Sequence, residues 1–315
     1  CVTGLAALGH EVIVFGKCEK EGLHGGVYWY PKEKMTGDWQ HYDVFIACEN
    51  SDLLVGRDAK FKILDFMCNH SVGQDASCVD LVVCRSDWHV NTLKQNSPEI
   101  ENKPFKVFWC GVDPSKYRKK IRKEKNRVFY SSSPDRGLVR VLKFWPLVLK
   151  KLPDAKLYVY YEFNKNFEAN KWRMDILGEM VHDIKHLLQQ PGVHNIGSVD
   201  QYTLAKEQQK AQLLVYPCDT IVPTEGFGMT PGEAFLADCA VLLSDCDAFP
   251  EIWGDVVAML PLPIDYGQWA DSVVELLSSK ELLQKYSLAG KQKVLTQYNW
   301  DVIVKQWDKF LKSVL

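Results

Sequence analysis

The sequence predicts an α/β protein built from two doubly wound domains. Short apolar runs rich in β-branched residues alternate with helical periods along the whole chain. Largely apolar strands separated by helices are typical of parallel sheets covered on both faces. The runs form two series, one after the other, which indicates two separate sheets. The length of 315 residues also exceeds what a single hydrophobic core commonly supports.

The expected strands follow one another in two sets. The first set lies at residues 11–15, 27–30, 43–47, 61–64, 80–84 and 106–109. The second set lies at residues 127–131, 156–161, 212–216, 240–244 and 256–260.

The chain begins with a helical pattern rather than a strand. This pattern ends at Gly9, where glycine suits a helix C-cap. The first strand of a doubly wound sheet usually lies in its middle, and no strand precedes this helix. We therefore expect the first domain to lack its first strand, and the sequence to be a fragment of a longer protein.

Charge marks the boundary between the domains. Residues 118–126 are polar and strongly basic, which favours a solvated linker, with a patch for anionic lipid headgroups as the alternative. The predicted domains are therefore 1–117 and 127–290, joined by this basic linker. Residues 291–315 contain a C-terminal helix.

The C-terminal helix is amphipathic. Val304, Trp307 and Leu311 follow the i, i+3, i+7 spacing of a single helix face. A face of this kind has to be buried, and we expect the helix to pack back across the domain junction.

Composition narrows the class of protein. Hydrophobic residues at 46% and charged residues at 25% are ordinary for a globular protein, and a net charge of −2 gives no argument for nucleic-acid binding. No apolar run reaches membrane-spanning length, and the start has no signal-peptide pattern. The ten cysteines form no C-x-x-C pair, so a zinc ribbon is not expected. Their scattered positions favour a reducing, cytoplasmic compartment.

The segment from Glu225 to Glu233 is the most informative for function. An apolar run at 213–217 leads into a glycine turn at 226–228, and a helix start follows at Thr230. Glycines let backbone N–H groups come close to a ligand, and a helix N-terminus favours negative charge. The two carboxylates can accept hydrogen bonds from hydroxyl groups on either side of a bound anion. A nucleotide-sugar, a diphosphate with hydroxyls at both ends, has this pattern.

A structural role for part of this segment is the alternative. Thr230 as N-cap with Glu233 three residues later would make a capping box. Two other signals carry less weight. The pair Asp245 and Asp247 has D-x-D spacing, but Asp247 is better interpreted as a helix N-cap, so no metal site is expected. The Gly-x-Gly turn lacks the acidic partner of a dinucleotide site.

Six segments in order carry a resemblance to a known family. The chain resembles the retaining GT-B glycosyltransferases of family 4, the glycosyl transferases group 1. The segments that carry the resemblance are residues 4–15, 108–113, 131–138, 193–199, 225–233 and 248–252.

The resemblance implies a fold and roles for individual residues. The fold would be GT-B, with two Rossmann-like domains facing a cleft, of which 1–117 serves the acceptor and 127–290 the nucleotide-sugar. Arg136 would bind the diphosphate, Glu225 the hydroxyls of the transferred sugar, and Glu233 the ribose. Further donor contacts would come from Ser132, Ser133, Gly226, Phe227, Gly228, Met229 and Thr230, with Ile196 and Val199 beside the base.

One slot of the family pattern stays open between two residues. The family often has a histidine at the end of the fourth strand that contacts the donor sugar. Either His70 or Cys68 falls there, and only His70 would preserve the role.

The activity implied is transfer of a sugar from a nucleotide-diphosphate-sugar to an acceptor hydroxyl, with retention and without a metal or cofactor. The acceptor would be a glycan, a lipid or another hydroxyl compound. A cytoplasmic protein is expected, with peripheral membrane contact through the basic residues as a further expectation. The alternatives are an inactive or fragmentary sugar-nucleotide binder, and a GT-B-like epimerase or phosphorylase.

Overall fold

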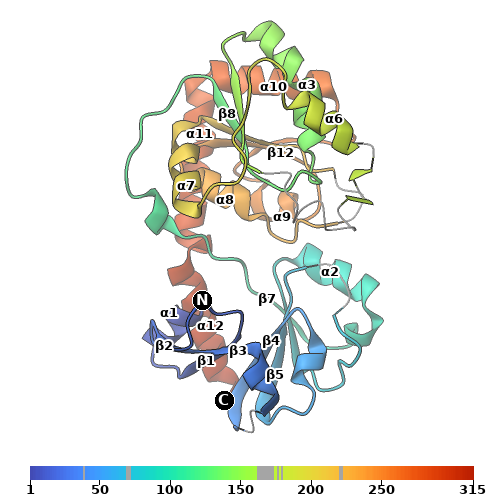
Figure 1. Ribbon diagram of the computed structural model, residues 1–315, viewed down its shortest axis with the longest axis vertical. Coiled ribbons are helices and arrows are strands. Elements are labelled where there is room, and N and C mark those ends of the chain that lie inside the picture. The colour runs from blue at the N-terminus through green and yellow to red at the C-terminus, as the bar shows by residue number, and fades with distance from the viewer. Residues whose placement is uncertain (38–39, 69–71, 162–173, 176, 179, 220–222) are drawn as a thin grey trace. The chain divides into compact units, whose positions relative to one another are not determined.

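The computed structural model describes residues 1–37, 40–68, 72–161, 174–175, 177–178, 180–219 and 223–315. The chain divides into two compact units (Figure 1). Residues 1–111 and 297–315 form the first unit, and residues 112–296 form the second. The short 3-10 helix η4 (Pro114–Tyr117) belongs to the second unit, because the Tyr117 hydroxyl donates to Gln208 at 2.7 Å.

The first unit contains two sheets instead of one. Strands β1 (Val12–Gly16), β3 (Val27–Pro31) and β2 (Gly22–His24) pair in that order, and β2 is antiparallel to β3. The second sheet is all parallel, in the order β4 (Tyr42–Cys48), β5 (Ala59–Asp65), β6 (Leu81–Cys84), β7 (Phe105–Val107).

The split arises at two strand edges. Within the described ranges, neither β1 nor β4 has a strand neighbour on its outer edge. The short strand β2 was not expected, because its three residues include a glycine and alternate poorly.

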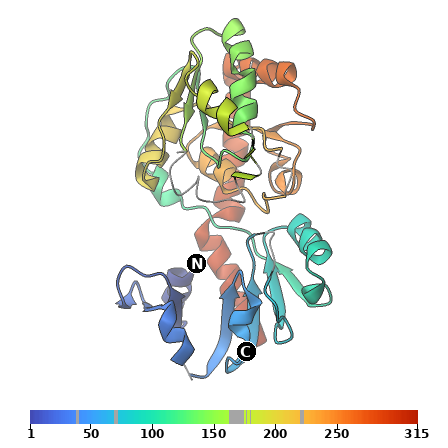
Figure 2. The same cartoon turned by 45° about the vertical axis from the view of Figure 1, so that its right-hand side comes forward.

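The core of the first unit joins the two ends of the chain. Helix α1 (Val2–Ala7) packs on helix α12 (Trp300–Val314), whose long red ribbon is visible beside the blue strands in Figure 2. The predicted apolar face of α12 is buried at Val304, Trp307 and Leu311. The Trp307 ring stacks on Phe108 with 4.3 Å between ring centroids.

The remaining helices of the first unit are short. They are α2 (Asp87–Asn96), η1 (Lys32–Gly37), η2 (Ser51–Leu54) and η3 (Pro98–Ile100).

The second unit is a six-stranded parallel sheet with helices on both faces (Figure 1). The strand order is β10 (Val193–Asn195), β9 (Lys156–Val159), β8 (Arg127–Tyr130), β11 (Leu213–Tyr216), β12 (Ala240–Ser244), β13 (Ala258–Leu260). Every residue of β8, β11 and β12 is buried, as expected for central strands covered on both faces.

Two groups of helices cover this sheet. The first group is α3 (Leu138–Lys151), α6 (Met180–Leu187) and α10 (Tyr266–Ser278). The second group is α7 (Gln201–Lys210), α8 (Met229–Leu236) and α11 (Lys280–Lys293). The short helix α9 (Phe249–Trp253) follows β12, and the π-helix η5 (Val294–Tyr298) leads into α12.

The basic segment 118–126 is only partly a solvated linker. Most of its charged side chains are exposed. Lys123 is not, because its ammonium donates to the carbonyls of Ala211 at 2.5 Å and Ala237 at 2.6 Å. These two residues are the C-caps of α7 and α8, so one cation satisfies the ends of two helices. No described helix is long and apolar enough to cross a membrane.

The Trp307→Ala variant tests the packing of α12. Removing this buried ring should lower the free energy of unfolding by about 3–5 kcal/mol, because the cavity it leaves cannot collapse fully. Urea unfolding measures the change. Lys305→Ala, on the exposed face of the same helix, serves as the control and should stay within about 0.5 kcal/mol of the parent. Equal loss in both variants would contradict this packing.

Candidate functional site

The candidate site lies at the carboxyl edge of the sheet in the second unit. Strands β8 and β11 are neighbours in this parallel sheet, so the loops that follow them leave the same edge side by side. The first loop carries Arg136, and the second carries Glu225. In open α/β sheets, ligands bind outside the carboxyl ends of the strands. The topology therefore brings together two loops that the sequence places about ninety residues apart.

A glycine lets these two loops approach. Gly137 has a φ of +90° and is the N-cap of α3. A Cβ at this position would lie 1.9 Å from the Pro217 carbonyl oxygen of the other loop. Only glycine fits both the left-handed backbone and this contact.

Tyr130 shapes the loop that carries Arg136. Its hydroxyl lies 2.7 Å from the Ser133 carbonyl oxygen and 3.0 Å from that of Arg136, so it hydrogen-bonds at two points of one turn. Within the same turn, the Ser133 hydroxyl donates to Asp135. Both predicted donor-binding serines, Ser132 and Ser133, are buried.

Arg136 and Glu225, assigned to different parts of the donor by the resemblance, form an ion pair with each other. The Arg136 Nη1 lies 2.6 Å from Glu225 Oε1. The Glu225 side chain is 4% exposed and the Arg136 side chain 28% exposed, so the arginine has the access to solvent. The pair neutralises a charge that would otherwise be buried alone, at a cost of several kcal/mol.

Tyr216 is the functional residue that sequence reasoning missed. It ends β11, and its hydroxyl donates to Glu225 Oε1 at 2.8 Å while accepting from the Ser132 hydroxyl at 2.7 Å. In the sequence it is one more aromatic residue of an apolar strand. Its position at the last residue of a strand that leads into the glutamate turn is the only signal that pointed to it.

The charge state of the pair follows from these contacts. Burial raises the pKa of the Glu225 carboxyl, while the Arg136 charge and the Tyr216 hydrogen bond act against this rise. Burial disfavours the Arg136 cation, but Glu225 and Tyr216 raise the pKa of the guanidinium above its ordinary value. The 2.6 Å contact with the Arg136 guanidinium and the Tyr216 hydrogen bond both favour the ionised form of Glu225, against the effect of burial.

The glycine turn after Glu225 is tightly held. Gly228, with a φ of +79°, is the N-cap of α8, and a Cβ there would meet the Phe249 ring at 2.5 Å. The Phe227 carbonyl accepts from Trp253 Nε1 at 2.9 Å. Helix α8 begins at Met229, so the expected N-cap role of Thr230 is wrong: the glycine already ends the turn two residues earlier.

Asp247 holds the backbone in front of Glu225. One oxygen of its carboxylate accepts from the backbone N–H of Thr224 at 2.9 Å and of Glu225 at 3.0 Å. The expected N-cap role of Asp247 is therefore wrong, because Ala248 occupies that position before α9. The carboxylate faces the glutamate loop instead. The described residues contain no group of three or more ligands that could hold a metal.

Glu233 lies on α8 and contacts a buried amide. Gln208 Nε2 donates to Glu233 Oε2 at 3.5 Å, and Gln208 Oε1 accepts from the Tyr117 hydroxyl. Burial raises the pKa of Glu233, and Gln208 and Lys116 oppose the rise. The carboxylate is thus oriented by a fully buried glutamine.

The other predicted site residues are less informative. Ile196, 46% exposed, and Val199, half-buried, follow β10. Met229 is exposed and Thr230 half-buried at the start of α8. His70 lies outside the described residues. The alternative, Cys68, is exposed at its side chain, and its carbonyl lies 3.0 Å from His89 Nε2.

His89 is a buried histidine of the first unit with a structural role. Its Nδ1 accepts the Arg85 backbone N–H, so the proton must sit on Nε2, which donates to Cys68. Burial lowers the pKa of His89 to about 4. It stays neutral near pH 7 and fixes the chain before residue 69.

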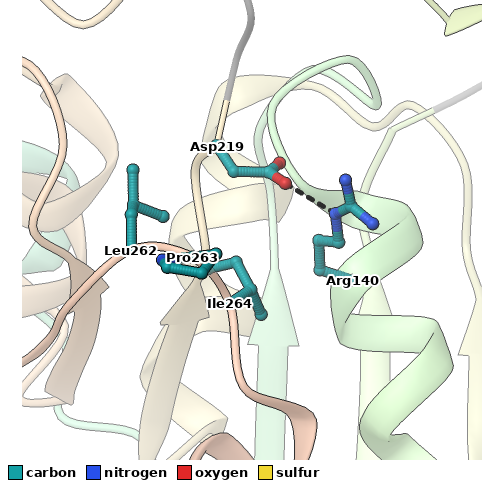
Figure 3. A pocket seen from close by; sticks show the side chains of 5 residues that line it. All are labelled: Arg140, Asp219, Leu262, Pro263 and Ile264. Atoms are coloured by element: carbon teal, nitrogen blue, oxygen red, sulfur yellow. Dashed lines mark hydrogen bonds and ion pairs between the residues drawn. The ribbon is translucent and has the colours of Figure 1, made fainter.

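A separate cavity lies beside the start of α3 and the loop that follows β11. It has a volume of about 560 Å³ and is lined by Arg140, Asp219, Leu262, Pro263 and Ile264. Figure 3 shows the Arg140 guanidinium directed at Asp219, with Nε 2.6 Å from the carboxylate. None of the predicted donor-binding residues is among these five.

Known proteins resemble this chain in sequence and in fold. The phosphatidyl-myo-inositol mannosyltransferase of Mycobacterium tuberculosis (strain H37Rv) is 26% identical over 240 residues, which cover 72% of this chain and 57% of that protein. Its counterpart in Mycobacterium leprae is 34% identical over 183 residues, covering 58% of this chain and 44% of the relative. The matched regions thus span 57% of the first relative and 44% of the second.

The fold has solved counterparts. Sucrose-phosphate synthase from Thermosynechococcus elongatus matches with a TM-score of 0.73 at 14% identity, over 99% of this chain and 91% of that one. At this identity the match shows the fold alone, and it confirms the expected GT-B arrangement of two Rossmann-like domains. Residues 113–293, more than half of the chain, match the family model described as "Glycosyl transferases group 1". The chain therefore belongs to the glycosyl transferases group 1 family.

Proposed function

We propose that this protein transfers a sugar from a nucleotide-diphosphate-sugar to an acceptor hydroxyl. The observation that carries the proposal is the ion pair of half-buried Arg136 with buried Glu225, beside a glycine turn and the start of α8. This arrangement offers a cation and backbone N–H groups to a diphosphate, and a carboxylate to the hydroxyls of a sugar. Family membership supports the same reaction class.

Charge development suggests how the site would act. As the glycosidic C–O bond breaks, negative charge grows on the departing diphosphate and positive charge on the sugar. Arg136 would exchange Glu225 for the diphosphate, and the greater exposure of its guanidinium supports this role. Glu225 is then free to accept hydrogen bonds from the sugar. Hydrogen-bond donors that are aligned before the reaction stabilise such charge without any rearrangement of the site.

We further propose retention of the anomeric configuration and catalysis without a metal. Both follow the family expectation. Arg136 and the N-terminal end of α8 would supply the positive charge that a divalent ion supplies elsewhere.

The acceptor we propose is a lipid or glycan hydroxyl. The mycobacterial relatives are named for transfer of mannose to phosphatidyl-myo-inositol, which makes a mannosyl donor and an inositol lipid the first pair to test. The exposed basic side chains of residues 118–126 offer a surface for anionic headgroups. A cytoplasmic protein with peripheral membrane contact fits this proposal.

A donor and acceptor panel tests the proposal directly. UDP-, GDP- and ADP-linked glucose and mannose are offered with phosphatidylinositol vesicles or simple sugars, with and without EDTA, and nucleoside diphosphate release is measured. We expect release with one donor, unchanged by EDTA. Binding without turnover would identify an inactive binder, and phosphorolysis or epimer formation without an acceptor would identify the other GT-B activities.

The Arg136→Ala variant tests the phosphate contact. Affinity for the nucleoside diphosphate of the active donor should fall by about 1.5–3 kcal/mol, the usual scale for a hydrogen bond to a charged group. Calorimetric titration measures it. Arg140→Ala is the matched control, one helical turn later, with its guanidinium already paired to Asp219. Equal affinity in parent and Arg136→Ala would remove Arg136 from the phosphate site.

The Glu225→Gln variant tests the sugar contact. Transfer should fall at least about 100-fold, since the amide has only one oxygen that can accept from sugar hydroxyls, whereas the affinity for the nucleoside diphosphate alone should not fall. The comparison needs steady-state kinetics and a titration on one protein preparation. Parallel loss of both quantities would mean that Glu225 does not act on the sugar.

A further inference from the structure

The Tyr216 hydroxyl lies between the loop of Arg136 and the carboxylate of Glu225. We propose that Tyr216 is a positioning residue for sugar transfer, whose hydroxyl keeps Glu225 in place and ionised when Arg136 turns from Glu225 to the diphosphate of the donor. This inference rests on the proposed transferase function. It adds to that function a residue whose role no motif of the sequence indicates.

The direction of the hydrogen bonds is fixed by their chemistry. A phenol has one proton to donate. The Ser132 hydroxyl approaches the Tyr216 oxygen at 2.7 Å, and the ionised Glu225 oxygen at 2.8 Å can only accept. The tyrosine proton therefore points to Glu225, and Ser132 fills an acceptor position on the phenol.

The ring has little freedom to move. Tyr216 is 1% exposed and ends the buried strand β11. It meets Tyr130 edge-on with 5.8 Å between ring centroids, and Phe249 with 5.4 Å. A side chain packed in this way holds its hydroxyl at a fixed point.

Arg136 and Tyr216 share one oxygen of Glu225. Both reach Oε1, so withdrawal of the arginine leaves the tyrosine as the side-chain donor on that oxygen. The negative charges of Asp135 and Asp247 then favour the protonated form of Glu225, as burial does. The titratable or charged groups that face Glu225 and Tyr216 are Arg136, Asp135, Asp247, Tyr130, Cys218 and Cys246.

The sign of the pH effect follows. Burial raises the pKa of Glu225, and the Tyr216 hydrogen bond lowers it. Removal of the hydroxyl therefore raises this pKa further, so the carboxylate takes up a proton at a higher pH. Since kcat reports ionisation in the donor complex, the acid side of the kcat profile should move to higher pH in a Tyr216→Phe variant.

Tyr130 supplies a matched control. It ends the neighbouring strand β8 and is also fully buried, but its hydroxyl contacts the carbonyls of Ser133 and Arg136. Tyr130→Phe removes a hydroxyl from the end of the neighbouring strand, but it leaves the hydrogen bond from Tyr216 to the Glu225 carboxylate in place. It should alter donor affinity through the Arg136 loop and leave the acid side of the kcat profile where the parent has it.

The experiment measures kcat from about pH 5.5 to about pH 8.5 for the parent, Tyr216→Phe and Tyr130→Phe. UDP-glucose, GDP-mannose and ADP-glucose are the donors tried, and melting temperatures report folding. For each protein, the ratio of kcat at the acid end to kcat at the alkaline end is calculated. In Tyr216→Phe this ratio should be about tenfold lower than in the parent, which is the scale of a hydrogen bond to a charged group. The Tyr130→Phe ratio should match the parent.

A double-mutant cycle separates this role from a structural one. If Tyr216 acts through Glu225, Tyr216→Phe should cost nothing further in a Glu225→Gln background. Coincident pH profiles of the parent and Tyr216→Phe, or additive losses in the cycle, would overturn the inference while the transferase function stands. Absence of turnover by the parent with all three donors would overturn the proposed function, and the inference with it.

Discussion

A carboxylate buried in the loop between β11 and α8 is the constraint on which the rest of the site depends. Glu225 is 3% exposed and ionised only with help from its surroundings. That help comes from two directions: a guanidinium from the neighbouring loop and a phenol from the strand that precedes it. Asp247 fixes the backbone at Glu225, but its charge acts against the ionised carboxylate. An unpaired charge in this place would be strongly destabilising. The packing of the loops is arranged around this requirement.

Under the proposed function, the requirement would also govern how the site binds its donor. The cation and the anion of the Arg136–Glu225 pair satisfy each other, so no buried charge is left alone. The diphosphate of the proposed donor would offer the arginine a second anionic partner, and the exchange would replace one charge pair with another. The binding energy would then be the difference between these two states, not the full strength of a new ion pair.

Sequence reasoning identified the strands well and the contacts between them poorly. Buried strands such as β8, β11 and β12 are continuous apolar runs, so their pattern is visible in the chain itself. The roles of Tyr216 and Asp247 depend on which strands are neighbours, and a single sequence does not contain that information. The helix start at α8 was misplaced because Thr230 and Glu233 fit a capping box, whereas Gly228 takes the left-handed conformation first. The division of the first unit into two sheets follows from the strand edges of β1 and β4.

The lysine that joins the ends of α7 and α8 has a consequence for how the basic segment responds to its medium. Exposed cations of this segment are screened by dissolved ions over roughly 10 Å at moderate ionic strength. The Lys123 ammonium is half-buried and bound to carbonyls at 2.5 and 2.6 Å, so added salt weakens its attraction far less. Helix α7 carries Gln208 and helix α8 carries Glu233. Counter-ions that gather on the outside of this segment would therefore leave the spacing of these two helices unchanged.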